Sequence, residues 1–116
     1  MCQVNNKRIY PEKDIICYKV VVKDPNDTFY SFYQGMVLLV NKILIAKGLH
    51  HPRHPLEIYG GMFHSYKYKK DTKRMKKFCG GVLIKCKIPK NTLIYEGLFG
   101  ISKSYSSRMI EILGEI

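Results

Sequence analysis

Short runs of β-branched and aromatic residues, each closed by residues that favour turns, recur along this chain of 116 residues. The first is DIICYKVVV at 14–22, which ends at KDPND and so predicts a strand followed by a turn. TFYSFYQG then predicts a second short strand or an extended segment, closed by Gly35. We therefore expect the chain to consist mostly of short antiparallel strands.

The clearest alternation lies in VLIKCKI at residues 82–88. Successive residues of a strand point to opposite faces, so one face of this strand is apolar and the other carries two lysines. A turn is expected at residues 89–91, and the Gly- and Ser-rich residues 97–107 are expected to form a loop. The closing RMIEILGEI predicts a last strand with Ile110 and Ile112 on one face.

The apolar stretch MVLLVNKILIAK at residues 36–47 fits two structures. It could be a buried helix that ends at Gly48, or a hairpin whose turn is Asn41 and Lys42. The apolar residues surround the helical wheel and leave no polar face, which favours the hairpin.

A basic amphipathic helix is predicted at about residues 68–79, and Gly80 with Gly81 ends it. At 100° per residue, one side of the helix is cationic. The other side is expected to form a narrow core stripe of five residues, which are Tyr68, Thr72, Met75, Phe78 and Cys79.

These elements predict an α+β fold of mostly short antiparallel strands with one clear helix. We expect a single domain over residues 1–116, with 1–13 as a loose N-terminal segment. No stretch approaches the roughly 20 apolar residues of a membrane-spanning helix, so no membrane partner is expected. The four cysteines form no CxxC pair, which suits reduced thiols in the cytoplasm, and Cys17 and Cys86 are expected in the core.

The net charge of +11 is concentrated in one segment. Residues 67–90 hold ten Lys or Arg and the single acidic residue Asp71, a local balance of +9. Such a field favours anionic ligands or polyanions. No P-loop, G-x-G-x-x-G or G-x-S-x-G motif occurs, so nothing supports catalysis by a standard motif.

The residues after Gly60-Gly61 form the best candidate for a ligand pocket. His64, Ser65 and Tyr66 would place a titratable ring, a hydroxyl and a stacking surface at the end of a short strand. The alternative is that Tyr66 belongs to the core and His64 is an ordinary strand-end residue. Phosphate-binding cations are expected from the helix and the later strands, namely Lys69, Lys73, Arg74, Lys85, Lys87 and Arg108.

Three histidines, His50, His51 and His54, stand in an HHPRHP segment. The two prolines exclude a helix, and no cysteine or carboxylate spacing completes a zinc site, so a solvated loop is favoured over a metal site. No metal or cofactor is expected.

The order ICYKVVV, FYSFYQG, GGMFHSYK, VLIKCKIPKNTLIYEG and YSSRMIEILGEI resembles a set of small uncharacterised proteins of phages and bacteria. The resemblance spans most of residues 15–116, with Asn91 where glycine is usual. It implies a shared fold and a phage or bacterial origin.

A more distant similarity is to ADP-ribosyltransferase-like folds, through KIPKNT and IEIL. It implies that Glu111 stands in the place of the catalytic glutamate. Lys19 stands where those enzymes have arginine, and FHSY replaces Ser-Thr-Ser.

The first functional hypothesis is a non-enzymatic protein that captures a phosphate-bearing small molecule, such as a nucleotide signal. A sequence-tolerant nucleic-acid binder is the second, because the lysines lie among aromatic residues. An enzyme acting through Glu111 is the third. A lysine-rich helix is also often a plain solvated surface.

Overall fold

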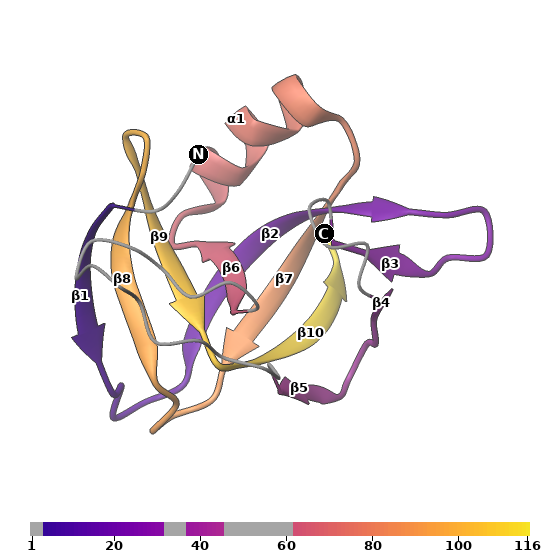
Figure 1. Ribbon diagram of the computed structural model, residues 1–116. Coiled ribbons are helices and arrows are strands. Elements are labelled where there is room, and N and C mark those ends of the chain that lie inside the picture. Colours follow the sequence, from indigo (N-terminus) through magenta and orange to yellow (C-terminus); the bar gives the residue numbers. More distant parts are fainter. Residues whose placement is uncertain (1–3, 32–36, 46–61) are drawn as a thin grey trace.

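The computed structural model describes residues 4–31, 37–45 and 62–116, with the side chains of residues 4–6 left aside (Figure 1). One helix and ten strands lie in this part of the chain. The helix is α1, Lys69–Cys79, and the strands are β1 Val4–Ile9, β2 Ile15–Lys23, β3 Phe29–Tyr30, β4 Val37–Leu38, β5 Ile43–Ile45, β6 Phe63–Tyr66, β7 Val82–Ile88, β8 Ile94–Phe99, β9 Ser102–Ser107 and β10 Met109–Glu115.

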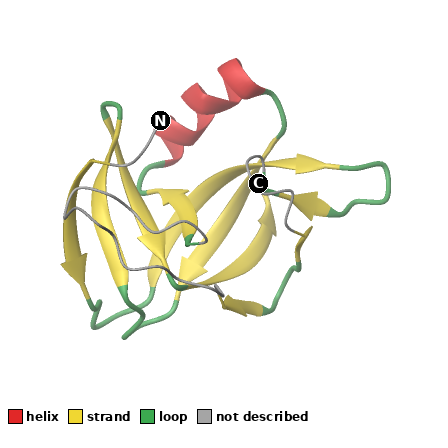
Figure 2. Ribbon diagram, in the orientation of Figure 1, coloured by secondary structure: helices red, strands yellow, loops and turns green. Residues whose placement is uncertain are grey.

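The strands form one large sheet in the order β1-β8-β9-β6-β2-β7-β10-β5, with β3 paired to β2 and β4 paired to β3 (Figure 2). Every ladder between named strands is antiparallel. The predicted α+β class is wrong, because 56% of the described residues lie in strands and 12% in the helix, which makes the fold sheet-dominated. The prediction gave the helix too much weight and placed a loop where a whole strand lies.

That strand is β9, which lies inside the predicted loop at residues 97–107. Gly100 turns the chain from β8 into β9 with a φ of 66°. Serine has a weak preference for strands, so the serine-rich sequence of β9 does not by itself predict a strand. Pairing with β6 on one side and β8 on the other holds β9 in place, and its serines are buried.

The centre of the sheet confirms the predicted alternation. Cys17 of β2 lies opposite Cys86 of β7, and Cys86 lies opposite Ile112 of β10. All three are fully buried in the hydrophobic core, as is Ile110. We call the face of the sheet that carries Cys17, Cys86 and Ile112 the core face, and the opposite face the second face.

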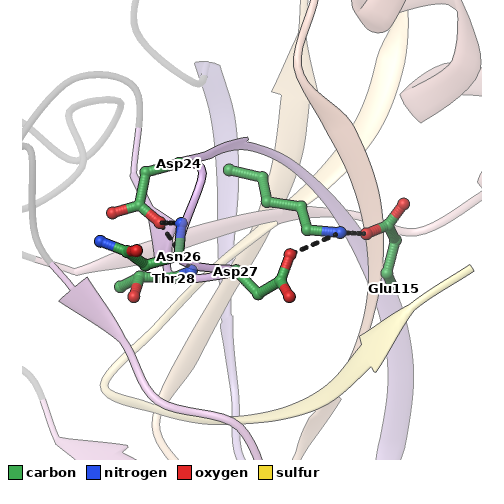
Figure 3. A network of polar contacts seen from close by, with 6 residues as sticks. Asp24, Asn26, Asp27, Thr28 and Glu115 are labelled. Atoms are coloured by element: carbon green, nitrogen blue, oxygen red, sulfur yellow. Dashed lines mark hydrogen bonds and ion pairs between the residues drawn. The ribbon is translucent and has the colours of Figure 1, made fainter.

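The turn after β2 also forms as predicted (Figure 3). The Asp24 carboxylate accepts hydrogen bonds from the backbone N–H groups of Asn26 and Thr28, each at 2.9 Å. Lys23, at the end of β2, pairs with Asp27 at 3.4 Å and with Glu115 of β10 at 2.9 Å. The turn is therefore tied to the end of the last strand.

Strands β4 and β5 lie in the predicted hairpin segment, but the predicted pairing between them is wrong. Asn41 does turn the chain, with a φ of 61°. However, β4 pairs with β3, and β5 pairs with β10. The Asn41 N–H donates to the Ile112 carbonyl at 2.8 Å, so the turn is attached to β10.

Helix α1 matches the prediction closely in its bounds. Gly80 caps it with a φ of 73°, and its N–H donates to the Lys76 carbonyl at 2.8 Å. Strands β6 and β7 lie on either side of β2, so the helix crosses over β2 between them. It packs against these three strands.

The predicted core stripe of the helix is mostly wrong. Phe78 is 83% exposed, Tyr68 is 41% exposed, and Cys79 is exposed. The buried positions are Asp71 and Thr72, in the first half of the helix. In Figure 1 the last turn of the helix is furthest from the strands. The helical wheel alone does not show which turns of the helix the sheet covers.

Two further expectations concern the ends of elements. Residues 1–13, expected to be a loose segment, contain β1, which pairs with β8. Asn91 has a φ of 63°, a conformation that glycine and asparagine adopt at low cost. Within the described residues, no helix is long and apolar enough to cross a membrane.

Candidate functional site

A pocket of about 370 Å³ lies between the first half of α1 and the turn from β8 to β9. The backbone N–H of Lys67, just before the helix, donates to the Lys103 carbonyl of β9 at 3.0 Å. This bond holds the start of the helix segment beside the hairpin. The residues that line the pocket are Tyr68, Lys70, Asp71, Arg74, Ile101 and Lys103.

The pocket is cationic. Lys70, Arg74 and Lys103 bring three positive charges, against the single carboxylate of Asp71. Asp71 is 6% exposed and lies 3.7 Å from the Arg74 guanidinium. Among the described residues, neither Lys70 nor Lys103 has a carboxylate within ion-pair distance. These two lysines therefore carry the excess charge.

The Tyr68 ring forms the aromatic wall of the pocket. The Lys70 ammonium lies over the ring at 5.5 Å from its centroid, and the Lys67 ammonium lies at 5.7 Å. Lys67 is already paired with Glu96 at 3.5 Å. Tyr68 precedes the helix, and its side chain makes no capping hydrogen bond there.

The structure divides the predicted site residues among several places. Arg74 lines the pocket, whereas Lys69 and Lys73 are exposed on α1 and do not. Arg108 is exposed at the junction of β9 and β10. Ser65 is buried on the core face at 2% exposure. The predicted cations and the strand-end residues do not converge.

The remaining predicted residues lie on the second face. Tyr18 lies opposite both Tyr66 of β6 and Lys85 of β7, so these three side chains form a row across the sheet. Tyr66 also meets the Phe99 ring edge-on, with centroids 6.2 Å apart. Lys87 is 3.8 Å from the Glu111 carboxylate. This face therefore holds a second, separate group of predicted residues.

His64 lies on the second face as a neutral group. Its Nδ1 is 3.2 Å from the Ser106 hydroxyl oxygen. Burial, and then the positive charge of Lys19, lower the pKa of His64 to about 4. At neutral pH the ring is uncharged, so it can offer a hydrogen bond to a ligand but no charge for a phosphate.

Lys19 is partly buried on the core face, in step with Cys17 and Val21 along β2. Its ammonium donates to the His64 carbonyl at 2.6 Å. Burial lowers the pKa of Lys19. The sequence alone indicates that Lys19 lies on the core face, because strand alternation puts it on the same face as the apolar core residues.

Glu111 does not share a cleft with Lys19. Glu111 lies opposite Lys87, which lies opposite Ile16, and all three therefore point to the second face. Lys19 is three residues further along β2 and points to the core face. The side chains of Glu111 and Lys19, which the expected resemblance would bring together in a transferase site, therefore lie on opposite faces of the sheet.

Sequence reasoning missed most of the pocket. The helical wheel places Tyr68 in the core stripe, and Lys103 falls in the predicted loop. No pattern among neighbouring residues predicts that Lys70 and Lys103 lie close together, because their proximity depends on the pairing of β9 with β6. His50, His51 and His54 lie outside the described residues. Within the described ones, no group of three His, Cys, Asp or Glu residues could hold a metal ion.

Comparison with protein-family models, with curated proteins and with solved structures finds no match. The chemistry of the pocket follows from its lining. Three cations and a phenol ring can bind an anion and stack on a flat group, whereas the lining residues include no serine, cysteine or histidine that could act as a nucleophile.

Proposed function

We propose that this protein is a non-enzymatic binder of a phosphate-bearing small molecule, with a nucleotide as the favoured class. The observation that carries the proposal is the convergence of Lys70 and Arg74 from α1 and Lys103 from β9 on one pocket beside Tyr68. Phosphate oxygens accept charge-assisted hydrogen bonds from such cations, and the ring offers a stacking surface for a base.

The size and charge of the pocket support a small ligand. Its volume of about 370 Å³ is within the range of about 300–1,000 Å³ that is typical of ligand pockets. The excess of two positive charges would balance a phosphate group. A base that stacked on Tyr68 would replace the Lys70 ammonium over the ring and free that lysine for the phosphate.

The proposed setting is the cytoplasm, where Cys17, Cys79 and Cys86 would stay reduced. A small binding protein acts on its ligand by lowering the free concentration. The proposed role is therefore the capture of a nucleotide signal, as a phage protein that counters a host defence would do.

A second candidate, sequence-tolerant binding of nucleic acid, is favoured by the outer part of the helix. Phe78 is 83% exposed beside the exposed Lys76 and Lys77. Exposed aromatic rings among cations can stack bases along a single strand. This surface lies outside the pocket, so the two functions can be separated by experiment.

Isothermal titration calorimetry against a panel of cyclic, linear and ADP-ribose-derived nucleotides tests the proposal. We expect saturable binding to one site, with a Kd below about 100 µM, which corresponds to roughly −5.5 kcal/mol. Weaker binding to every member would contradict it. Affinity that grows with oligonucleotide length and falls steeply with salt would instead support the nucleic-acid function.

A further inference from the structure

Cys17 and Cys86 face each other across the two central strands. They are direct partners in the antiparallel register of β2 and β7, and both are fully buried in the same core cluster. Directly opposite residues of an antiparallel pair have Cα atoms about 4.5–5.5 Å apart. A disulfide spans Cα atoms about 4.4–6.8 Å apart, so the Cα spacing of this pair is compatible with a bond between the two sulfurs.

The geometry points to a redox modification site: we propose that Cys17 and Cys86 form a reversible disulfide across β2 and β7 when the protein meets hydrogen peroxide. The inference is independent of the proposed ligand, because neither cysteine lines the pocket at Tyr68. It differs from the expectation that the two cysteines serve only as core residues.

The surroundings of the pair assign different roles to the two thiols. A hydrogen bond from the Cys86 thiol, together with smaller effects of Ser65 and of the Lys19 charge, lowers the pKa of Cys17 against the opposing effect of burial. The same hydrogen bond and burial raise the pKa of Cys86. Cys17 is therefore the more readily deprotonated of the two thiols, which assigns it to react first and Cys86 to resolve the product.

The reaction is balanced with peroxide as the oxidant. The Cys17 thiol gives up its proton, the thiolate attacks one peroxide oxygen, and the O–O bond breaks. Cys17 becomes a sulfenic acid, and the hydroxide that leaves takes up the released proton to form one water. The Cys86 sulfur then attacks the Cys17 sulfur, an S–S bond forms, and the sulfenic oxygen leaves as a second water. Hydrogen peroxide is small enough to reach the buried pair when the sheet opens locally. A larger oxidant, such as a small-molecule disulfide, would reach the pair less readily.

The chain contains a matched control thiol. Cys79 is exposed at the end of α1, and its sulfur lies 3.5 Å from the Met75 sulfur. An exposed single thiol can be oxidised, but neither of the other two cysteines in the described part of the chain is paired with it across strands. Cys79 therefore reports on peroxide exposure.

The test uses the folded wild-type protein and a Cys79→Ser variant. Each is treated with hydrogen peroxide, unfolded in the presence of N-ethylmaleimide, and examined by intact mass and peptide mapping. We expect a product that carries two fewer N-ethylmaleimide groups and two fewer hydrogens than the alkylated reduced protein, and in which the Cys17 peptide is joined to the Cys86 peptide. Treatment with dithiothreitol before alkylation should reverse the change. The disulfide should raise the urea concentration at the midpoint of unfolding.

Two outcomes would overturn the inference. One is that Cys17 and Cys86 both remain fully alkylated at peroxide exposures that cross-link the urea-unfolded chain. The other is that Cys79 in the wild-type protein links to either buried cysteine as often as they link to each other. The cross-link is measured in the wild-type protein. The test therefore needs no Cys17→Ser or Cys86→Ser variant, whose folding a core substitution could impair.

Discussion

The Lys19 ammonium donates a hydrogen bond to the backbone carbonyl of His64, with 2.6 Å between Nζ and O. This bond joins β2 to β6, beside the registered pair Tyr18 and Tyr66. It also brings a positive charge close to a buried imidazole, and this charge contributes to the lowered pKa of His64. Burial is the largest cause of the lowered pKa of both Lys19 and His64.

The buried His64 should make stability fall in acid. Its pKa is about 4 in the folded protein and near 6.5 when unfolded, so the unfolded chain binds more protons between these values. Stability from this group is fully present above pH 6.5 and is lost as the pH falls through 4, by about 3 kcal/mol. Urea unfolding of wild type and His64→Gln across this window measures the effect, and equal slopes for the two proteins would refute it.

Replacing Lys19 tests how much its charge and how much burial contribute to the lowered pKa of His64. In Lys19→Met the positive charge is gone, so the pKa of His64 should rise above 4, but it should stay below 6.5 because burial is the larger cause. NMR titration of the His64 ring protons gives the value directly. A full return to 6.5 would mean that the charge of Lys19, and not burial, sets the pKa.

The C-cap of α1 should tolerate only glycine. Gly80 has a φ of 73° and a ψ of −153°, a region that other residues almost never adopt. A Cβ there would meet nothing within 4 Å, so Gly80→Ala should lower the free energy of unfolding by roughly 1–3 kcal/mol through backbone strain alone. The exposed Lys77→Ala is the control, with an expected change within about 0.5 kcal/mol. Equal stability of the two variants would contradict the assigned cap.

The Tyr68 ring should distinguish nucleotides from plain phosphate. Tyr68→Ala removes the stacking surface and should weaken nucleotide binding by about 1–3 kcal/mol, while Tyr68→Phe should bind like wild type. Inorganic phosphate should bind both variants equally. Phe78→Ala is the matched control, because Phe78 is an exposed ring on the same helix outside the pocket. If Phe78→Ala loses as much affinity as Tyr68→Ala, bases stack along the helix surface.

The parts of the fold that follow local periodicity could be predicted from the sequence. The alternation that buries Ile84, Cys86 and Ile88 and the period of α1 both appear within a few residues. Strand β9 could not be predicted, because serines enter a sheet only when partner strands pair with them. The exposure of Phe78 is likewise decided by where the helix meets the sheet.

The candidate site was less predictable than the fold. The charge of Arg74 identifies it as a candidate, but charge density alone does not separate it from Lys69 and Lys73, which lie on the same helix outside the pocket. Lys103 joins the pocket only through the pairing of β9. The separation of Lys19 from Glu111 depends on the register of β2, β7 and β10, which the alternation within each single strand does not determine.

The most direct test of the proposed function compares two charge reversals. Lys103 lines the pocket, and Lys90 is an exposed lysine in the turn at the far end of β8. Calorimetry with the tightest nucleotide of the panel should show that Lys103→Glu weakens binding roughly tenfold or more, because a hydrogen bond to a charged group contributes about 1.5–3 kcal/mol. Lys90→Glu should leave the Kd unchanged at physiological salt. Equal losses in both variants would show that the overall positive charge, and not the pocket at Tyr68, attracts the ligand.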